Sequence, residues 1–136
     1  MTTTTPWAHL PNAKHIDAVL ADVNTRPEVW KAARDAARDA AWAAAWDAAW
    51  AAVRAAARAA AWVAAGDAAR YTLNAVGATA RHAAQDIIRA LIAWDSSADL
   101  LDLPADTLRT MIDLAPEPVC HQAALLLPWT IVREAT

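Results

Sequence analysis

Several residue types are scarce in this sequence, and each shortage excludes a class of protein. Only two glycines are present, so the chain holds no glycine-rich phosphate-binding loop. The single cysteine, Cys120, excludes an intrachain disulfide and fits a reducing compartment. Positive charge is also in short supply, because the net charge is -3. A chain of this charge is not expected to bind nucleic acid by neutralising phosphates.

Long uncharged apolar runs are missing too. Asp47, Arg54 and Arg58 interrupt the alanine-rich middle of the chain, so no run reaches the roughly 18 residues that a membrane span needs. The N-terminus lacks the positive start and apolar run of a signal peptide. We therefore expect one cytoplasmic domain over residues 1–136, without membrane contact, in which 1–11 form a loose N-terminal arm.

A four-residue repeat dominates what is present, since tryptophan or arginine recurs at every fourth position and alanine fills most of the rest. The series runs through Trp30, Arg34, Arg38, Trp42, Trp46, Trp50, Arg54, Arg58 and Trp62. Alanine is the best helix former, and Thr25-Arg26-Pro27-Glu28 has the form of a capping box with proline in the first turn. The pattern predicts one long helix over about 27–65, followed by a turn or kink at Gly66.

A second pattern predicts a core helix over about 67–95. Its apolar residues fall on alternating three- and four-residue steps, the spacing of a helix packed lengthwise against neighbours. These residues are Leu73, Val76, Ala80, Ala83, Ile87, Ala90 and Trp94, with Ile88 and Leu91 beside them. Gly77 inside this pattern indicates a close helix contact or a kink.

Shorter helices are expected on both sides of this pair. Asn12 is suited to cap a helix whose buried stripe is formed by Ile16, Val19, Leu20 and Val23. Pro104 begins another helix, and a final apolar helix starts at Val119 and is ended or kinked by Pro128. No segment alternates with the period of a strand. The sequence predicts an all-α, single-domain helical bundle of five or six helices.

A four-residue period does not stay on one side of a helix. Each step turns the stripe by roughly 40°, so the tryptophans from Trp30 to Trp62 cannot all face one core. Part of the stripe would then face a second subunit or a ligand. The series is also palindromic about Trp46, which suggests an antiparallel homodimer, because a twofold interface is self-complementary.

The stripe offers a candidate binding site. The site would have flat aromatic faces from Trp42, Trp46 and Trp50. It would also have guanidinium groups, able to donate paired hydrogen bonds, from Arg38, Arg54 and Arg58. This combination suits a small anionic aromatic, nucleotide-like ligand. The competing interpretation is that the tryptophans fill gaps between helices while arginines one turn away lie over them, as Arg54 would over Trp50.

Other polar residues give weaker signals for chemistry. His82 lies one turn before Asp86, and His121 follows Cys120, but no zinc-binding spacing is present. Four aspartates between Asp95 and Asp106 flank helix breaks, where capping explains them better than acid–base catalysis. We expect no metal, no cofactor and no enzymatic activity. An enzyme would need these aspartates, or His82, Asp86 and His121, to meet in one cleft.

The units DAARDAAW, AAWDAAW and GDAARY, followed by LIAWDSSADLLDLPADTLR and ALLLPW, resemble a set of alanine-rich proteins of bacteriophages and high-GC bacteria. Some of these are labelled immunity proteins. The resemblance covers about residues 30–130 and implies a small accessory protein in phage–host conflict. It transfers no individual site residue.

Two hypotheses of function follow from the sequence. In the first, the protein is a non-catalytic, phage-type anti-defence protein that sequesters a small nucleotide-like ligand in the host cytoplasm. In the second, it is an interaction or immunity protein that blocks a protein partner through its surface. Binding of small ligands distinguishes the first hypothesis from the second.

Overall fold

A computed structural model of the chain describes residues 7–8, 10–40, 43–59, 73 and 77–135. Within these ranges every regular element is helical, and together the elements form a single all-α bundle, as predicted. The elements are α1 (Ala13–Thr25), α2 (Pro27–Ala40), α3 (Ala43–Ala59), α5 (Ala78–Ala93), the 3₁₀-helix η1 (Asp95–Leu100), α6 (Ala105–Leu114) and α7 (Val119–Glu134). Among the described residues, no helix combines the length and the apolar character needed to cross a bilayer.

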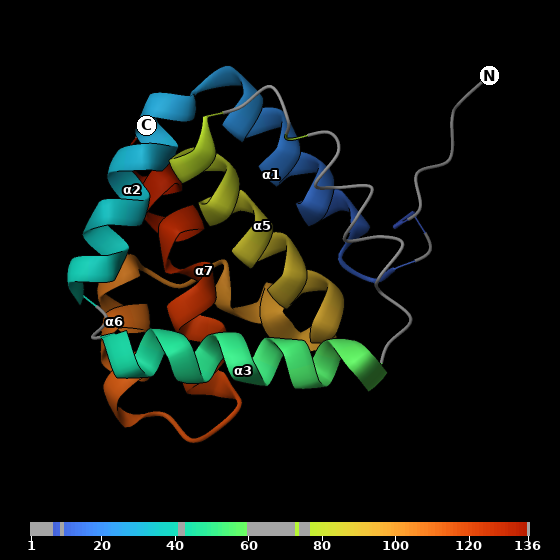
Figure 1. Cartoon of the computed structure of the whole chain (residues 1–136), viewed down its shortest axis with the longest axis vertical. Helices are drawn as coiled ribbons and strands as arrows, with labels where there is room; N and C mark the ends of the chain where they lie inside the picture. Colours follow the sequence, from blue (N-terminus) through green and yellow to red (C-terminus); the bar gives the residue numbers. More distant parts are fainter. Residues whose placement is uncertain (1–6, 9, 41–42, 60–72, 74–76, 136) are drawn as a thin grey trace.

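Helix α7 is the centre of the bundle. It contacts α2, α3, α5 and α6, and Figure 1 shows it enclosed by these helices. Every residue from His121 to Thr130 is buried. A helix that is apolar on all sides needs neighbours on all sides, and the segment Ala124–Trp129 meets this condition.

The last helix was predicted to be ended or kinked by Pro128, and it does not end there, because α7 continues through Pro128 to Glu134. A proline inside a helix removes one backbone hydrogen bond and costs about 3 kcal/mol relative to alanine. Pro128 is buried, so the apolar contacts around it offset this cost. Backbone hydrogen bonding is intact at the C-terminal end, where Ala135 N–H donates to the Ile131 carbonyl at 3.1 Å.

The single long helix predicted over about 27–65 is also wrong. The described residues form two helices instead, α2 and α3, which run in clearly different directions in Figure 1. Both contact α7, whose 16 residues extend roughly 24 Å. A straight helix of about 38 residues would extend roughly 57 Å and leave much of its length without a partner. Residues 41–42 and 60–65 lie outside the described part of the chain.

The predicted stripe of α1 is confirmed, since Ile16, Val19, Leu20 and Val23 are all buried. Asn12 does not cap this helix with its side chain. Its Nδ2 instead donates to the carbonyls of Leu91, Trp94 and Asp95 at 2.9, 3.3 and 3.2 Å. Asn12 therefore connects the start of α1 to the backbone where α5 ends and η1 begins.

The residues around α1 also depart from the expected capping. Thr25 is the last residue of α1, and its hydroxyl donates to the Ala21 carbonyl at 2.9 Å. It therefore does not form the predicted capping box, although Pro27 does begin α2. Within the predicted N-terminal arm, Trp7 is buried and its indole N–H donates to Asp17 at 2.8 Å.

The core helix predicted over about 67–95 is shorter in the structure, because α5 spans Ala78–Ala93 and the described residues before it, Leu73 and Gly77, are not helical. The buried stripe itself is confirmed in the described part of 67–95. Ala80, Ala83, Ile87 and Ala90 are buried, as are Leu73, Ile88 and Leu91. Gly66 and Val76 lie outside the described residues. Gly77 immediately precedes the helix, and a Cβ atom added there would meet no atom of the described residues within 4 Å. The close helix contact predicted at Gly77 is therefore wrong.

Candidate functional site

Polar side chains from three helices enclose a cavity of about 280 Å³. Helix α2 contributes Arg34 and α3 contributes Trp50, while α5 contributes His82, Gln85, Asp86 and Arg89. The four α5 residues follow the i, i+3, i+4, i+7 spacing, which places them on one face of that helix. We call this space the α2–α3–α5 cavity.

Asp86 is the buried acid of the cavity, with a relative exposure of 3%. Burial raises the pKa of its carboxyl to about 6, because desolvation disfavours the charged form. The Trp50 indole N–H, which donates a hydrogen bond to the carboxylate, opposes this rise. The positive charges of Arg89, Arg34 and Arg38 oppose it further. Desolvation of the carboxyl therefore raises the pKa by more than these four partners lower it.

Trp50 is surrounded by positive charge. The guanidinium carbon of Arg54 lies 4.7 Å from the centre of a Trp50 ring, and that of Arg89 lies 4.9 Å away. Both distances are within the range of cation–π attraction. Because the indole N–H also binds Asp86, Trp50 connects the acid to the surrounding arginines.

Two buried donors on side chains that line the cavity have no hydrogen-bond acceptor among the described residues. They are Nε of Arg34 and Nε2 of Gln85, neither of which has a partner among the residues that the structure describes. A buried donor left unpaired costs about 1–3 kcal/mol, so such groups are rare in folded proteins. Both side chains line the same cavity, which is therefore complementary to a molecule rich in acceptor atoms.

The six site residues predicted from the stripe have different surroundings. Trp50 and Arg54 are in contact, and Arg38 is exposed on α2 while still acting on Asp86. Trp46 is part of the core, with 7% exposure. Trp42 lies outside the described residues, as does the side chain of Arg58. The structure therefore groups Trp50, Arg54 and Arg38 around Asp86, and it encloses Trp46 in the core.

The packing interpretation describes Trp30 and Trp46, while Trp42 and Trp62 lie outside the described residues. Trp30 is fully buried, and the cation–π pair expected between Trp50 and Arg54 is present. The antiparallel dimer was predicted from the palindrome about Trp46, with the whole series on one unbroken helix and Trp46 at the interface. That geometry is absent, since Trp46 is buried and α2 and α3 are separate helices. A homo-oligomer stays a prediction without this support.

Sequence reasoning overlooked Arg34 as a distinct site residue and missed Gln85 and Arg89 entirely. A signal for the second pair was present, because His82, Gln85, Asp86 and Arg89 form a polar stripe on a helix that is otherwise apolar. Polar side chains along one face of a core helix indicate that this face lies against solvent or a binding site.

The other residues considered for chemistry do not meet at this cavity. His121 is buried on α7, and its Nε2 lies 3.4 Å from Glu117 Oε1. Asp106, in the first turn of α6, pairs with Arg109 at 2.6 Å. Within the described part of the chain, no three His, Cys, Asp or Glu residues are grouped closely enough to hold a metal ion.

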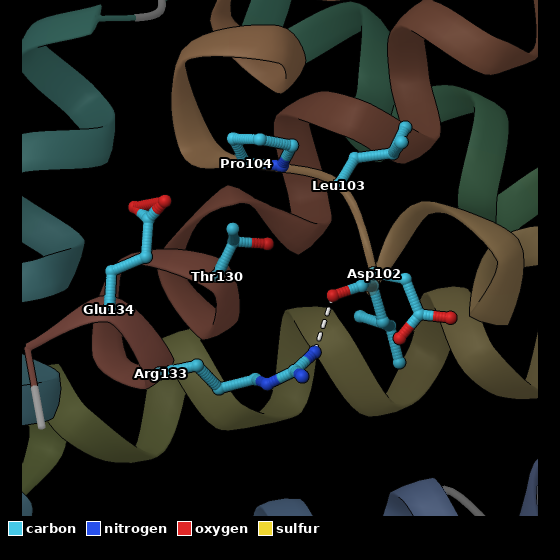
Figure 2. Close-up of a pocket in the computed structure, with 7 residues that line it drawn as sticks. Asp102, Leu103, Pro104, Thr130, Arg133 and Glu134 are labelled. Carbon is cyan, nitrogen blue, oxygen red and sulfur yellow. Dashed lines mark hydrogen bonds between the residues drawn. The ribbon is translucent and has the colours of Figure 1, made fainter.

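A second cavity, of about 320 Å³, lies where the end of α7 meets the segment between η1 and α6. Figure 2 shows Arg133 and Glu134 extending from α7 toward this segment. Arg133 donates to the Leu101 carbonyl, and Glu134 accepts a hydrogen bond from Ala105 N–H at 3.1 Å. Because these charged groups bind the backbone, they hold the start of α6 against the end of α7.

Comparisons of the chain with protein families, with curated proteins and with solved structures give no match. The functional argument therefore rests on the α2–α3–α5 cavity itself.

Proposed function

We propose that this protein is a non-catalytic helical binding protein that takes up a small anionic, ring-bearing ligand at the α2–α3–α5 cavity. The observation that carries the proposal is the pair of buried, unpartnered donors, Arg34 Nε and Gln85 Nε2. A phosphate or carboxylate group offers several acceptor atoms and would satisfy both donors at once. Burial of these donors without an acceptor would otherwise be an uncompensated cost.

The balance of charge supports an anion. Arg34, Arg38 and Arg89 act on the Asp86 carboxyl, and Arg54 lies over Trp50 beside it. Three guanidinium groups thus act on one acid and a fourth lies over Trp50, so these groups together are positive although the whole chain carries -3. A positive cleft attracts anions and raises their local concentration.

The size of the cavity limits the kind of ligand. At about 280 Å³ it is at the lower end of ligand pockets, which suits one anionic group or a single ring. The remainder of a nucleotide-like molecule would lie outside, near the exposed Arg38 and Arg54. Arginine stacks on aromatic and heterocyclic rings, so these side chains are suited to hold that part.

Isothermal titration calorimetry against AMP, GMP and inorganic phosphate tests the proposal. We expect at least one of them to bind, and we expect Arg34→Ala to weaken that binding by about tenfold or more, since a charged hydrogen bond is worth about 1.5–3 kcal/mol. Arg81→Ala is the matched control, because Arg81 is on α5 but does not line the cavity. If the wild-type protein binds none of the three probes, the proposal is rejected.

One observation favours the second candidate, an interaction protein that blocks a protein partner. A groove of about 510 Å³ between α2 and α7 has almost wholly apolar walls. It is lined by Glu28, Val29, Ala32, Ala33, Ala36, Ile131 and Ala135. Exposed apolar grooves of this kind occur at protein interfaces. An Ala36→Glu variant would abolish capture of such a partner and leave AMP or phosphate binding unchanged.

Either function is compatible with the accessory role in phage–host conflict that the sequence resemblance implies. Sequestration of a nucleotide-derived signal requires only a binding site, which agrees with the absence of a catalytic motif in the sequence. Light scattering after size-exclusion chromatography would show whether the protein acts as a monomer or as the expected homo-oligomer.

A further inference from the structure

We infer that Asp86 is a built-in counter-ion of the α2–α3–α5 cavity, and that the cavity takes up its anion together with a proton that binds to this carboxyl. The inference rests on the function proposed above and specifies how binding at that site responds to pH. It follows from where Asp86 lies relative to the charges around it.

The groups that face Asp86 come from three helices. Helix α2 contributes Arg34 and Arg38, and α5 contributes Arg89 and the nearby His82. Helix α3 contributes the Trp50 indole N–H, over whose ring Arg54 lies. Among the described residues, α1 and α7 add no charged group that acts on this carboxyl. In the ligand-free cavity, Asp86 is therefore the anion that balances the arginines.

An incoming anion would compete for the same arginines. The cavity of about 280 Å³ would hold it close to the Asp86 carboxylate, with little water between them. Two like charges at short range in a poorly solvated site repel strongly, and a carboxyl relieves that repulsion by binding a proton. The proton comes from solvent and binds to a carboxyl oxygen, and no other bond forms or breaks.

Protonation also changes the hydrogen bonding of the cavity. A charged carboxylate only accepts hydrogen bonds, whereas the protonated acid has one O–H that can donate to the anion. The neutral acid would add a third donor to Arg34 Nε and Gln85 Nε2. The carboxyl is already prepared for this change, because burial holds its pKa at about 6, close to neutral pH.

Carbon-13 NMR of the Asp carboxyl groups tests the inference directly on the wild-type protein. The titration of Asp86 is followed without ligand and then with saturating AMP or, if AMP does not bind, with GMP or inorganic phosphate. We expect the pKa of Asp86 to rise from about 6 to about 7 or higher when the site is filled. An unchanged or lower pKa would overturn the inference.

A variant provides a second, independent measurement. The affinity of Asp86→Asn for the same probe is divided by that of the wild type, which cancels the titration of the phosphate group itself. We expect this ratio to be about tenfold or more at pH ~7.5 and to approach one at pH ~5, where wild-type Asp86 is protonated. Asp35→Asn is the control, since Asp35 is exposed on α2, and its ratio should stay near one.

The two proposals fail in different ways. If none of AMP, GMP and phosphate binds, the proposed function is rejected and the inference with it. If a probe binds while the Asp86 pKa stays unchanged and the affinity ratio is the same at both pH values, only the coupling to a proton is rejected. If Asp86→Asn does not fold, the wild-type NMR titration alone decides.

Discussion

Trp30 and Trp129 stack with ring centroids 5.4 Å apart and planes inclined by 22°. This contact joins the first turn of α2 to the second half of the central helix. The Trp30 indole N–H also donates to Asp22 at 2.7 Å, and Asp22 forms a salt bridge with Arg26. One tryptophan thus connects α1, α2 and α7.

The stacked pair should contribute strongly to stability. We expect Trp30→Ala to lower the free energy of unfolding by about 3–5 kcal/mol, because it leaves a large cavity beside Trp129 and removes the donor to Asp22. Urea denaturation followed by circular dichroism measures this change. The control is Leu114→Ala, which should shift stability by less than about 0.5 kcal/mol, since Leu114 is 79% exposed. Similar values for both variants would contradict the role of the pair.

Asn12 should also matter more than its position at the start of a helix suggests. Asn12→Ala removes the donor to three carbonyls around the junction of α5 and η1, and we expect a loss of about 1–3 kcal/mol. Asn24→Ala makes the same chemical change where Nδ2 donates to the Leu20 carbonyl of its own helix. That control should cost about 1 kcal/mol or less. Equal losses in urea denaturation would show that the contact between α1 and α5 is unimportant.

The buried acid should make stability depend on pH. Folded Asp86 holds its proton up to about pH 6, compared with an ordinary pKa of 3.8, so between these values the folded state binds more protons. Asp86 therefore contributes to the free energy of unfolding at low pH, and this contribution is lost as the pH rises through 6. Relative to Asp86→Asn, the wild type should gain about 2 kcal/mol between pH ~7.5 and pH ~4.5.

This comparison isolates one group, which is why the variant is needed. The pKa of His15 is lowered by burial and by Lys14, so His15 has the opposite effect and destabilises the folded state at low pH. It is present in both proteins and cancels in the difference. Urea denaturation at several pH values provides the measurement. A constant difference across this range would contradict the raised pKa of Asp86.

Gly77 offers a stabilising change. It occupies the N-cap position of α5 with φ -58° and ψ 152°, has no side-chain cap, and leaves open space where a Cβ would lie. Gly77→Ser would supply an oxygen for the free N–H groups of the first turn and would restrict the unfolded chain. We expect a gain of about 0.5–1.5 kcal/mol in thermal or urea unfolding, with a smaller gain for Gly77→Ala. A loss of stability would argue against this cap geometry.

The sequence predicted the buried positions correctly in helices that pack a single face against the core. The stripe of α1 and the stripe of α5 were predicted correctly, because three- and four-residue spacings specify a face without reference to partners. The alanine-rich segment was predicted too long for the opposite reason. Its repeat is equally compatible with one helix or two, and the choice depends on the length of α7, on which both α2 and α3 pack.

The candidate site was predicted only in part. Trp50, Arg54 and Arg38 belong to the stripe, but their shared neighbour Asp86 is contributed by α5, more than 30 residues further along the chain. Local spacing cannot reveal that α5 places its polar face against α2 and α3. The raised pKa of Asp86 could not be predicted either, since it follows from burial, which arises only when the three helices pack together.

The central position of α7 has a consequence for how the chain assembles. The helices that enclose it precede it in the sequence, and α2 is separated from it by almost 80 residues. On a ribosome, α1 to α6 would emerge before the helix on which most of them pack. Contacts between distant segments also slow folding, because a long loop must close before they form. We therefore expect this small helical protein to fold more slowly than bundles of neighbouring hairpins, with its alanine-rich helices forming late and on the surface of α7.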